Sequence, residues 1–122
     1  MTIIKSVFYG LTIWLILSAC ENKIKFEKDR WTIKGDLGIY PYRSQMLDDL
    51  IQNQELKGLT YKQLIDKIGE PEKGYDSDSN SIYYDIVIDY GQDIDPVYVK
   101  TLEFNLDRDS IVTDFKINEI KH

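Results

Sequence analysis

Three runs of alternating apolar and polar residues fill the second half of the chain, and they constrain its fold more than any other feature. They cover residues 81–90, 97–106 and 111–119. Alternation with a period of two is typical of a β-strand with one buried face. The connections at 91–96 and 107–110 are short, so consecutive strands should pair antiparallel. The sequence therefore predicts a three-stranded antiparallel meander.

Residues 72–80, before the first strand, are polar and rich in turn formers, so we expect a loop there.

The alternation also predicts which side chains face the interior. Nine tyrosines are present, and those left outside the core would suit a protein contact because tyrosine combines apolar area with a hydroxyl. Four of them lie on or near the first two strands: Tyr83, Tyr84, Tyr90 and Tyr98. The predicted inward set is Ile82, Tyr84, Ile86, Ile88, Tyr90, Leu102, Phe104, Leu106, Ile111, Phe115 and Ile117.

A short helix at about 61–68 has clear start and stop signals. Thr60 and Gln63 fit a capping box, in which each side chain satisfies a backbone amide of the other residue. Gly69 suits the helix end because glycine adopts positive φ at little cost, and Pro71 prevents continuation. The apolar face of this helix consists of Leu64, Ile65 and Ile68.

A second helix is predicted over 44–52, with Ser44 as its N-cap and an apolar face at a 3.6-residue period. That face consists of Met46, Leu47, Leu50 and Ile51. Scattered apolar residues between Trp31 and Tyr40 indicate an extended segment that packs on the domain. Because these two helices are the only available cover for the apolar sheet face, the predicted fold class is α+β.

The N-terminus has the pattern of an export signal. Lys5 provides a positive charge, and residues 6–19 carry none. A helix of that length spans about 21 Å, which is shorter than a hydrocarbon core of about 30 Å. A signal segment over 1–19 therefore fits better than a retained transmembrane helix.

The apolar run ends in Leu17-Ser18-Ala19-Cys20, which resembles the lipobox of bacterial lipoproteins. The resemblance implies cleavage before Cys20 and attachment of fatty acyl chains, such as palmitate, to its sulfur and new amino group. Two or more chains hold a protein on a bilayer effectively permanently. The alternative is an ordinary signal peptide with an incidental cysteine.

These signals divide the chain into a signal peptide at 1–19, a lipidated cysteine with a flexible tether at 20–30, and one α+β domain at 31–122. Residues 21–30 are mostly charged and aperiodic, as expected for a tether. Glu21 follows the cysteine where an Asp would favour retention at the inner membrane. The expected location is therefore the cell envelope, at the outer membrane on its periplasmic or outer side, with the lipid bilayer as one partner.

Composition excludes several classes of function. A formal net charge of −6 opposes binding to nucleic acid, and the single cysteine allows no internal disulfide. The only histidine is the last residue, His122, so a catalytic triad has little to draw on. The seven glycines form no phosphate-binding loop. We therefore predict no enzyme activity and no cofactor.

Two acidic loops are candidate metal sites. Residues 76–80 imitate the start of an EF-hand, but Ser81 replaces the glycine and Val87 replaces the bidentate Glu. Asp89, Asp93 and Asp95 could gather around a cation. Acidic loops usually face water, so the expectation is a solvated surface and no metal.

Four short motifs together resemble the SmpA/OmlA (BamE-like) family of small outer-membrane lipoproteins, over residues 56–118. They are Gly58-Leu59-Thr60, Ile68-Gly69-Glu70-Pro71, Tyr83-Tyr84 and Leu102-Glu103-Phe104-Asn105. The resemblance implies two helices on a three-stranded antiparallel sheet, with Gly58, Thr60, Gly69 and Pro71 as the fold-defining residues. Its founding members assist outer-membrane protein assembly by binding other subunits and lipid, and the same layout serves β-lactamase inhibitor proteins.

The functional hypothesis is a membrane-anchored module that binds an envelope protein, with a possible accessory role in outer-membrane assembly. The rival is an inhibitor or immunity lipoprotein that caps a toxin or a cell-wall hydrolase, since an acidic surface suits a basic target. A purely structural envelope lipoprotein is the third hypothesis.

Overall fold

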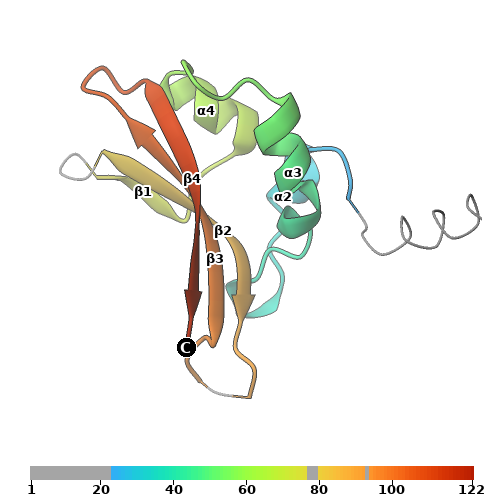
Figure 1. The fold of residues 1–122 in the computed structure, drawn as a ribbon. Coiled ribbons are helices and arrows are strands. Elements are labelled where there is room, and N and C mark those ends of the chain that lie inside the picture. The colour runs from blue at the N-terminus through green and yellow to red at the C-terminus, as the bar shows by residue number, and fades with distance from the viewer. Residues whose placement is uncertain (1–22, 77–79, 93) are drawn as a thin grey trace, which may run out of the picture.

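A computed structural model of the chain describes residues 23–76, 80–92 and 94–122. The predicted signal peptide, its recognition residues and Cys20 lie outside them. Figure 1 shows the arrangement of the elements. In order they are α2 (Lys28–Trp31), the 3₁₀ turn η1 (Asp36–Gly38), α3 (Arg43–Asn53), α4 (Tyr61–Ile68), β1 (Lys73–Asp76), β2 (Ser81–Asp89), β3 (Tyr98–Leu106) and β4 (Val112–Lys121).

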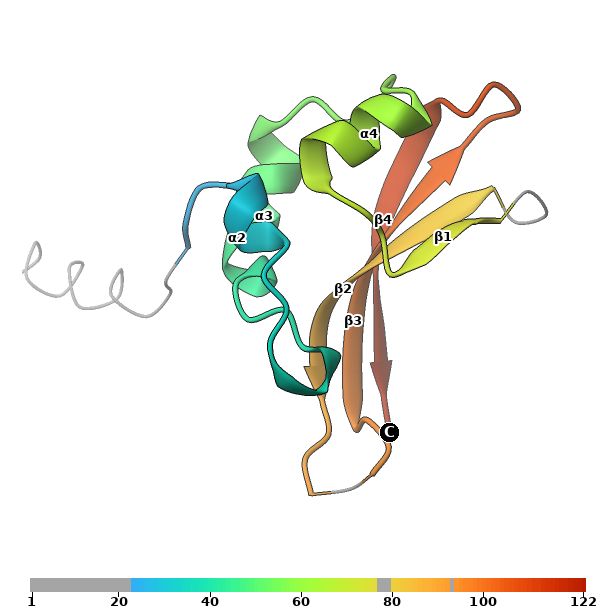
Figure 2. The ribbon, with the colours of Figure 1, turned by 180° about the vertical axis from the view of Figure 1, so that it is seen from behind.

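The described strands form one antiparallel sheet in the order β1-β2-β3-β4. Helices α2, α3 and α4 lie on one face of it, as Figures 1 and 2 show from opposite sides. The predicted α+β fold, helices packed on an antiparallel meander, is confirmed. The expected loop at 72–80 is wrong in part, because Lys73–Asp76 pairs with β2. That pairing uses backbone hydrogen bonds, which leave no apolar pattern in the sequence.

The capping box of α4 is present as predicted. The amide of Gln63 donates to Thr60 Oγ1 at 3.1 Å, and the amide of Thr60 donates to Gln63 Oε1 at 3.0 Å. Gly69 ends the helix with a φ of 108° and a ψ of 177°, a region that is open almost only to glycine. A Cβ at this position would also lie 2.7 Å from Thr32 Cγ2, so the residue permits close packing of α2 against α4.

Gly58 and Thr60 join α4 to the start of β4. The amide of Gly58 donates to the carbonyl of Val112 at 2.8 Å, and the amide of Val112 donates to the carbonyl of Leu59 at 2.8 Å. Gly58 has a φ of 89°, and Thr60 forms an isolated bridge with Ile111. These bonds hold the helix over the β3–β4 turn.

Helix α3 begins one residue earlier than predicted. It starts at Arg43, and Tyr42 is the N-cap without a side-chain bond, so the expected Ser44 cap is wrong. No side-chain hydroxyl caps this helix, and its first residue, Arg43, is buried. The predicted apolar face is correct, with Met46, Leu47 and Leu50 buried.

A β-bulge in each of two strands changes the predicted inward set. In β2 the register shifts between Asp85 and Val87, so that Val87 packs on the core while Ile88 pairs with Val99. In β4 it shifts across Thr113, so that Val112 is buried in place of Ile111. An extra residue in one strand reverses the alternation beyond it.

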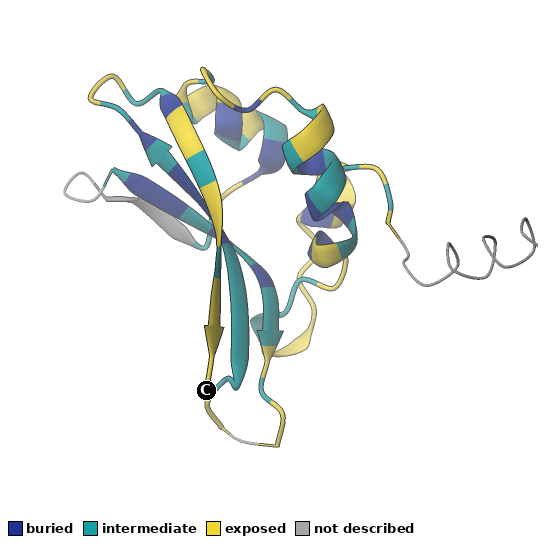
Figure 3. Cartoon of the chain, in the orientation of Figure 1, coloured by how far each residue is buried: buried dark blue, intermediate teal, exposed yellow. Residues whose placement is uncertain are grey.

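Two further inward predictions differ at the ends of strands. Tyr90 lies beyond the end of β2. Ile117 lies opposite the buried Leu102 on the helix side but is 39% exposed, because β4 is an edge strand of the sheet. Figure 3 shows that most of β4 is exposed. The remaining predicted residues of β2 and β3 are buried, and Phe115 packs against the core.

A chain of aromatic contacts crosses the core from the N-terminal segment to β4. It passes through Phe26, Trp31, Tyr84, Phe104 and Phe115, with successive ring centroids 5.6, 6.2, 5.8 and 5.9 Å apart. Edge-to-face and tilted pairs at this spacing add to the free energy gained by burial. The core is therefore continuous from the first described residues to the last strand.

The expected tether at 20–30 is wrong for residues 23–30, which pack on the domain. The amide of Ile24 donates to the carbonyl of Gln45 at 3.1 Å, and that of Phe26 donates to Asp49 Oδ2 at 2.7 Å. Ile24 and Phe26 also pack against the core. Two apolar residues among many charged ones give only a weak sequence signal for packing. In the structure, α3 provides a hydrogen-bond acceptor for the backbone amide of each. The packed domain therefore includes Ile24 rather than beginning at Trp31.

This contact should depend on pH through Asp49. The Phe26 amide, then the Asn53 side chain, hold the pKa of Asp49 below its ordinary value of 3.8. A carboxyl with a lowered pKa stabilises the packed segment fully above pH 3.8, and the effect is lost as the pH falls through the lowered value. We expect the hydrogen-exchange protection factor of the Phe26 amide to be high at pH 6 and to fall in strong acid.

An Asp49→Asn variant should show weak Phe26 protection at every pH. The amide of Gly58, which donates to a backbone carbonyl in a distant part of the fold, serves as the internal control. Protection of Phe26 that is independent of pH in the unmodified chain would contradict this role of Asp49.

Candidate functional site

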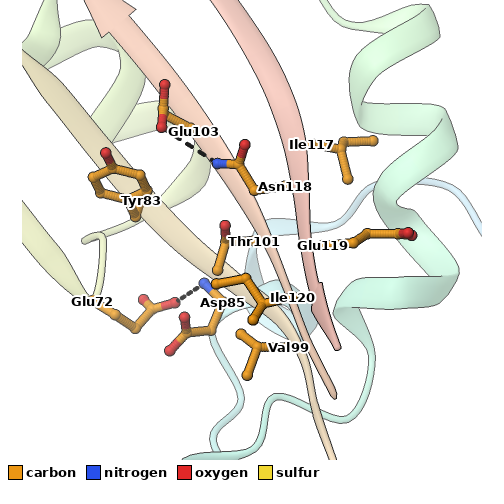
Figure 4. Close-up of a pocket in the computed structure, with 10 residues that line it drawn as sticks. All are labelled: Glu72, Tyr83, Asp85, Val99, Thr101, Glu103, Ile117, Asn118, Glu119 and Ile120. Atoms are coloured by element: carbon orange, nitrogen blue, oxygen red, sulfur yellow. Dashed lines mark hydrogen bonds between the residues drawn. The ribbon is translucent and has the colours of Figure 1, made fainter. Parts of the chain in front are cut away.

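The face of the sheet opposite the helices, here called the outer face, carries a pocket of about 890 Å³. No described helix covers this face in either view of the ribbon. Figure 4 shows that Ile117 and Glu119 border the pocket but point to the other side of β4. The remaining residues that line this outer-face pocket are Glu72, Tyr83, Asp85, Val99, Thr101, Glu103, Asn118 and Ile120.

Strand pairing orders the outer face into three rows across β2, β3 and β4. Successive rows are two residues apart along β3, or about 7 Å. The first row holds Tyr83, Glu103 and Lys116, the second holds Asp85, Thr101 and Asn118, and the third holds Ile88, Val99 and Ile120. The face therefore changes from acidic to apolar along the strands.

Glu103 is the centre of a polar network in the first row. It is only 8% exposed although no described helix covers it. Asn118 Nδ2 donates to Glu103 Oε1 at 3.3 Å, and Lys116 Nζ lies 3.6 Å from Oε2. A hydrogen bond from the Tyr83 hydroxyl to Glu103 raises the pKa of Tyr83. Neighbouring polar groups therefore compensate the burial of this carboxylate.

The second row contains a carboxylate of a different kind. The backbone amide of Asp85 donates to Glu72 Oε1 at 2.6 Å, and its carbonyl accepts from Arg43 Nη1 at 2.9 Å. The Asp85 side chain is half-buried and points into the pocket beside Glu72 (Figure 4). Among the described residues it has no hydrogen-bond or ion-pair partner.

Glu72 is held in place by Arg43, whose side chain is 1% exposed. Arg43 Nη1 donates to Glu72 Oε1, and Nε donates to the carbonyl of Trp31 at 2.9 Å. The guanidinium carbon lies 3.5 Å from the centroid of the Tyr40 ring and 5.0 Å from that of Trp31. A buried guanidinium needs this combination of carboxylate, carbonyls and ring faces.

Sequence analysis missed the burial of Arg43, although a signal was present. Arg43 precedes Met46, Leu47 and Leu50 by three, four and seven residues, which places it on the buried stripe of α3. A charged residue on such a stripe needs a buried partner. Glu72, in the expected loop, is that partner. Because it is distant from Arg43 in the sequence, no local pattern predicts the pair.

The tyrosines that were candidates for a protein contact lie in different parts of the domain. Tyr83 lines the pocket, whereas Tyr84 is in the core, where its hydroxyl donates to the carbonyl of Gly69 at 2.7 Å and burial raises its pKa. The hydroxyl of Tyr98 donates to Glu119 Oε1 at 3.0 Å, on the helix side of the sheet. Of the four candidate tyrosines, Tyr83 is therefore the one that lines the described pocket.

The metal candidates find no support in the described residues. Within these residues no three acidic, histidine or cysteine side chains converge as a metal site requires. Residues 77–79 of the EF-hand imitation, and Asp93, lie outside that part of the chain. His122 is exposed, and its backbone amide donates to the carbonyl of Val97 at 2.9 Å.

Replacing Arg43 should show that it supports the pocket. Arg43→Met leaves Glu72 and two carbonyls without their buried donor, and we expect a loss of about 3–5 kcal/mol in the free energy of unfolding. Lys116→Met removes the cation of a more exposed pair and should cost less than about 1 kcal/mol. Urea unfolding measures both variants. Equal losses would contradict the role of Arg43.

Comparisons with known proteins assign no function to the outer-face pocket. Within the described ranges no helix has the length and apolar character that a bilayer span requires. A search against protein-family models, curated proteins and solved structures finds no match to the chain. The residues themselves and the motif resemblance in the sequence therefore remain as the indications of function.

Proposed function

We propose that the chain is a lipid-anchored envelope protein that binds a protein partner through the outer face of its sheet. The anchor is supported by the lipobox-like Leu17-Ser18-Ala19-Cys20 after an uncharged apolar run. The binding role is carried by one observation: the described helices cover one face of the sheet, and the other face holds the outer-face pocket. A location at the outer membrane remains part of this proposal.

The short distance in sequence between Cys20 and the packed domain supports a role close to the membrane. Ile24 already donates a backbone bond to α3. Four residues reach at most about 14 Å when extended. Acyl chains on Cys20 would therefore hold the domain at the bilayer surface, rather than on a long tether.

Residues 23–31, which follow the proposed attachment point in the sequence, and the pocket lie on opposite sides of the domain. Residues 23–31 pack on α3, and the helices separate them from the outer face of the sheet in Figures 1 and 2. A partner could therefore reach the pocket while the helix side remains next to the membrane. This arrangement suits a module that presents one surface to another envelope protein.

The chemistry of the outer face suits a protein partner. Tyr83 offers a ring and a hydroxyl, and Ile120 is 52% exposed at the edge of the pocket. Protein interfaces combine aromatic and apolar contacts with a polar rim. The resemblance to the SmpA/OmlA (BamE-like) family extends the proposal to an accessory role in outer-membrane protein assembly.

Replacing the cysteine tests the anchor. In a bacterial host, the unmodified chain should incorporate radioactive palmitate and sediment with membranes, and its mature mass should lack residues 1–19. Cys20→Ser should abolish the label and the cleavage, because only a thiol accepts the thioether-linked lipid. Ser18→Ala, which keeps a small residue before the cysteine, is the matched control. A native product with a free thiol and residues 1–19 attached would exclude the anchor.

The second candidate is an inhibitor or immunity lipoprotein, favoured by the net charge of −6 and by the carboxylates of the outer face. A partner isolated by crosslinking from native membranes would distinguish the two roles. If the partner is a hydrolase or a toxin, stoichiometric addition of this protein should abolish its activity. A partner without such an activity, held in a stable complex, would instead favour the binding module.

A further inference from the structure

We propose that the outer-face pocket takes an extended basic segment of the protein partner, with two cationic side chains at alternate positions and an apolar side chain at the adjoining alternate position. This inference rests on the proposed binding function and names its site and its ligand. The proposed pattern of cationic and apolar side chains follows from the residues of the three outer-face rows.

The second row provides the strongest reason for a cation. The Asp85 carboxylate points into the pocket and has no described partner, while its neighbour Glu72 is bound to Arg43. A half-buried carboxylate has lost part of its hydration, and an incoming ammonium or guanidinium group would restore a favourable contact. The backbone groups of Asp85 are bonded within the fold, and no described residue pairs with its carboxylate, so this side chain can serve a ligand.

The first row provides a second place for a cation. Glu103 accepts bonds from Asn118 and Tyr83, and its one described cation is Lys116 Nζ at 3.6 Å. The Lys116 side chain is largely exposed, so the contact is weak and can be exchanged. A cation from the partner can therefore replace or join Lys116 here.

The third row provides an apolar position. Val99 and Ile120 face each other across β3 and β4, and Ile120 is largely uncovered. The rows are about 7 Å apart, which is also the distance between alternate side chains of an extended peptide. A strand-like segment lying along β3 would place two cations on the first two rows and an apolar side chain on the third.

The partner is thus a protein segment rather than a lipid surface or a nucleic acid. Both of those carry negative charge, which the carboxylates of the first two rows would repel. A basic peptide is attracted by the same carboxylates and by the net charge of −6 over the whole chain.

Photocrosslinking of the full chain in native membranes tests the inference. We would replace Ile120, at the edge of the pocket, with p-benzoylphenylalanine, and place the same group at Leu37 on the helix side as a control. Both positions carry exposed large apolar side chains. We expect strong crosslinks at position 120 to a peptide with Lys or Arg at two alternate positions and an apolar residue at the adjoining alternate position.

A charge variant should confirm that Asp85 contributes. Asp85→Asn keeps the shape and the backbone bonds, and we expect it to reduce the crosslink at position 120 about fivefold, as for one partly exposed ion pair. Asp109→Asn removes an equal charge from an exposed turn and should leave the yield unchanged.

The failures of the two proposals can be told apart. Protein crosslinks at position 37 with none at 120 would overturn the pocket but preserve a binding function. Crosslinks at 120 to acidic peptides or to lipid, or a yield unaffected by Asp85→Asn, would also overturn the basic segment. Absence of protein crosslinks at both positions would count against the binding function itself.

Discussion

The buried pair of Arg43 and Glu72 is the interaction on which the rest of the structure depends. It joins the first turn of α3 to the segment before β1, and the same guanidinium bonds to the carbonyls of Trp31 and Asp85. Such a pair is weak evidence for stability, because desolvation offsets most of its attraction. Its geometry, however, is demanding. Four separate parts of the chain must arrive together before the charge is satisfied, which favours one arrangement over its competitors.

The pair also determines the chemistry of the outer face. Because Glu72 is occupied by Arg43 and by the amide of Asp85, the Asp85 side chain is left pointing into the pocket without a described partner. The bulge that follows it moves Ile88 to the outer face, where it pairs with Val99. Acidic and apolar rows thus meet on one surface. The buried Arg43 on the helix side therefore influences which polar groups the opposite face exposes.

The fold separates the segment next to the proposed lipid anchor from the outer face proposed to bind a partner. Residues 23–31 attach to the helices, and the aromatic chain from Phe26 to Phe115 continues through the core to β4. The domain is held close to the proposed lipid anchor, and the outer face is left free. This separation explains how so small a domain could be fixed at a membrane and still engage a protein partner.

Local signals in the sequence determined the capping box of Thr60 and Gln63, the helix end at Gly69 and the apolar faces of α3 and α4. These features depend on residues within one or two helical turns, so the sequence alone predicts them. The alternation of β2, β3 and β4 likewise predicted an antiparallel meander.

Only the tertiary structure decided the bulges, the pairing of β1, the packing of Ile24 and Phe26, and the burial of Arg43. Each depends on a partner distant in the chain: an extra residue is accommodated only against its neighbouring strand, and a buried charge is tolerated only beside its counter-ion. The pocket combines several of these long-range features. For that reason the sequence predicted the fold class but not the site.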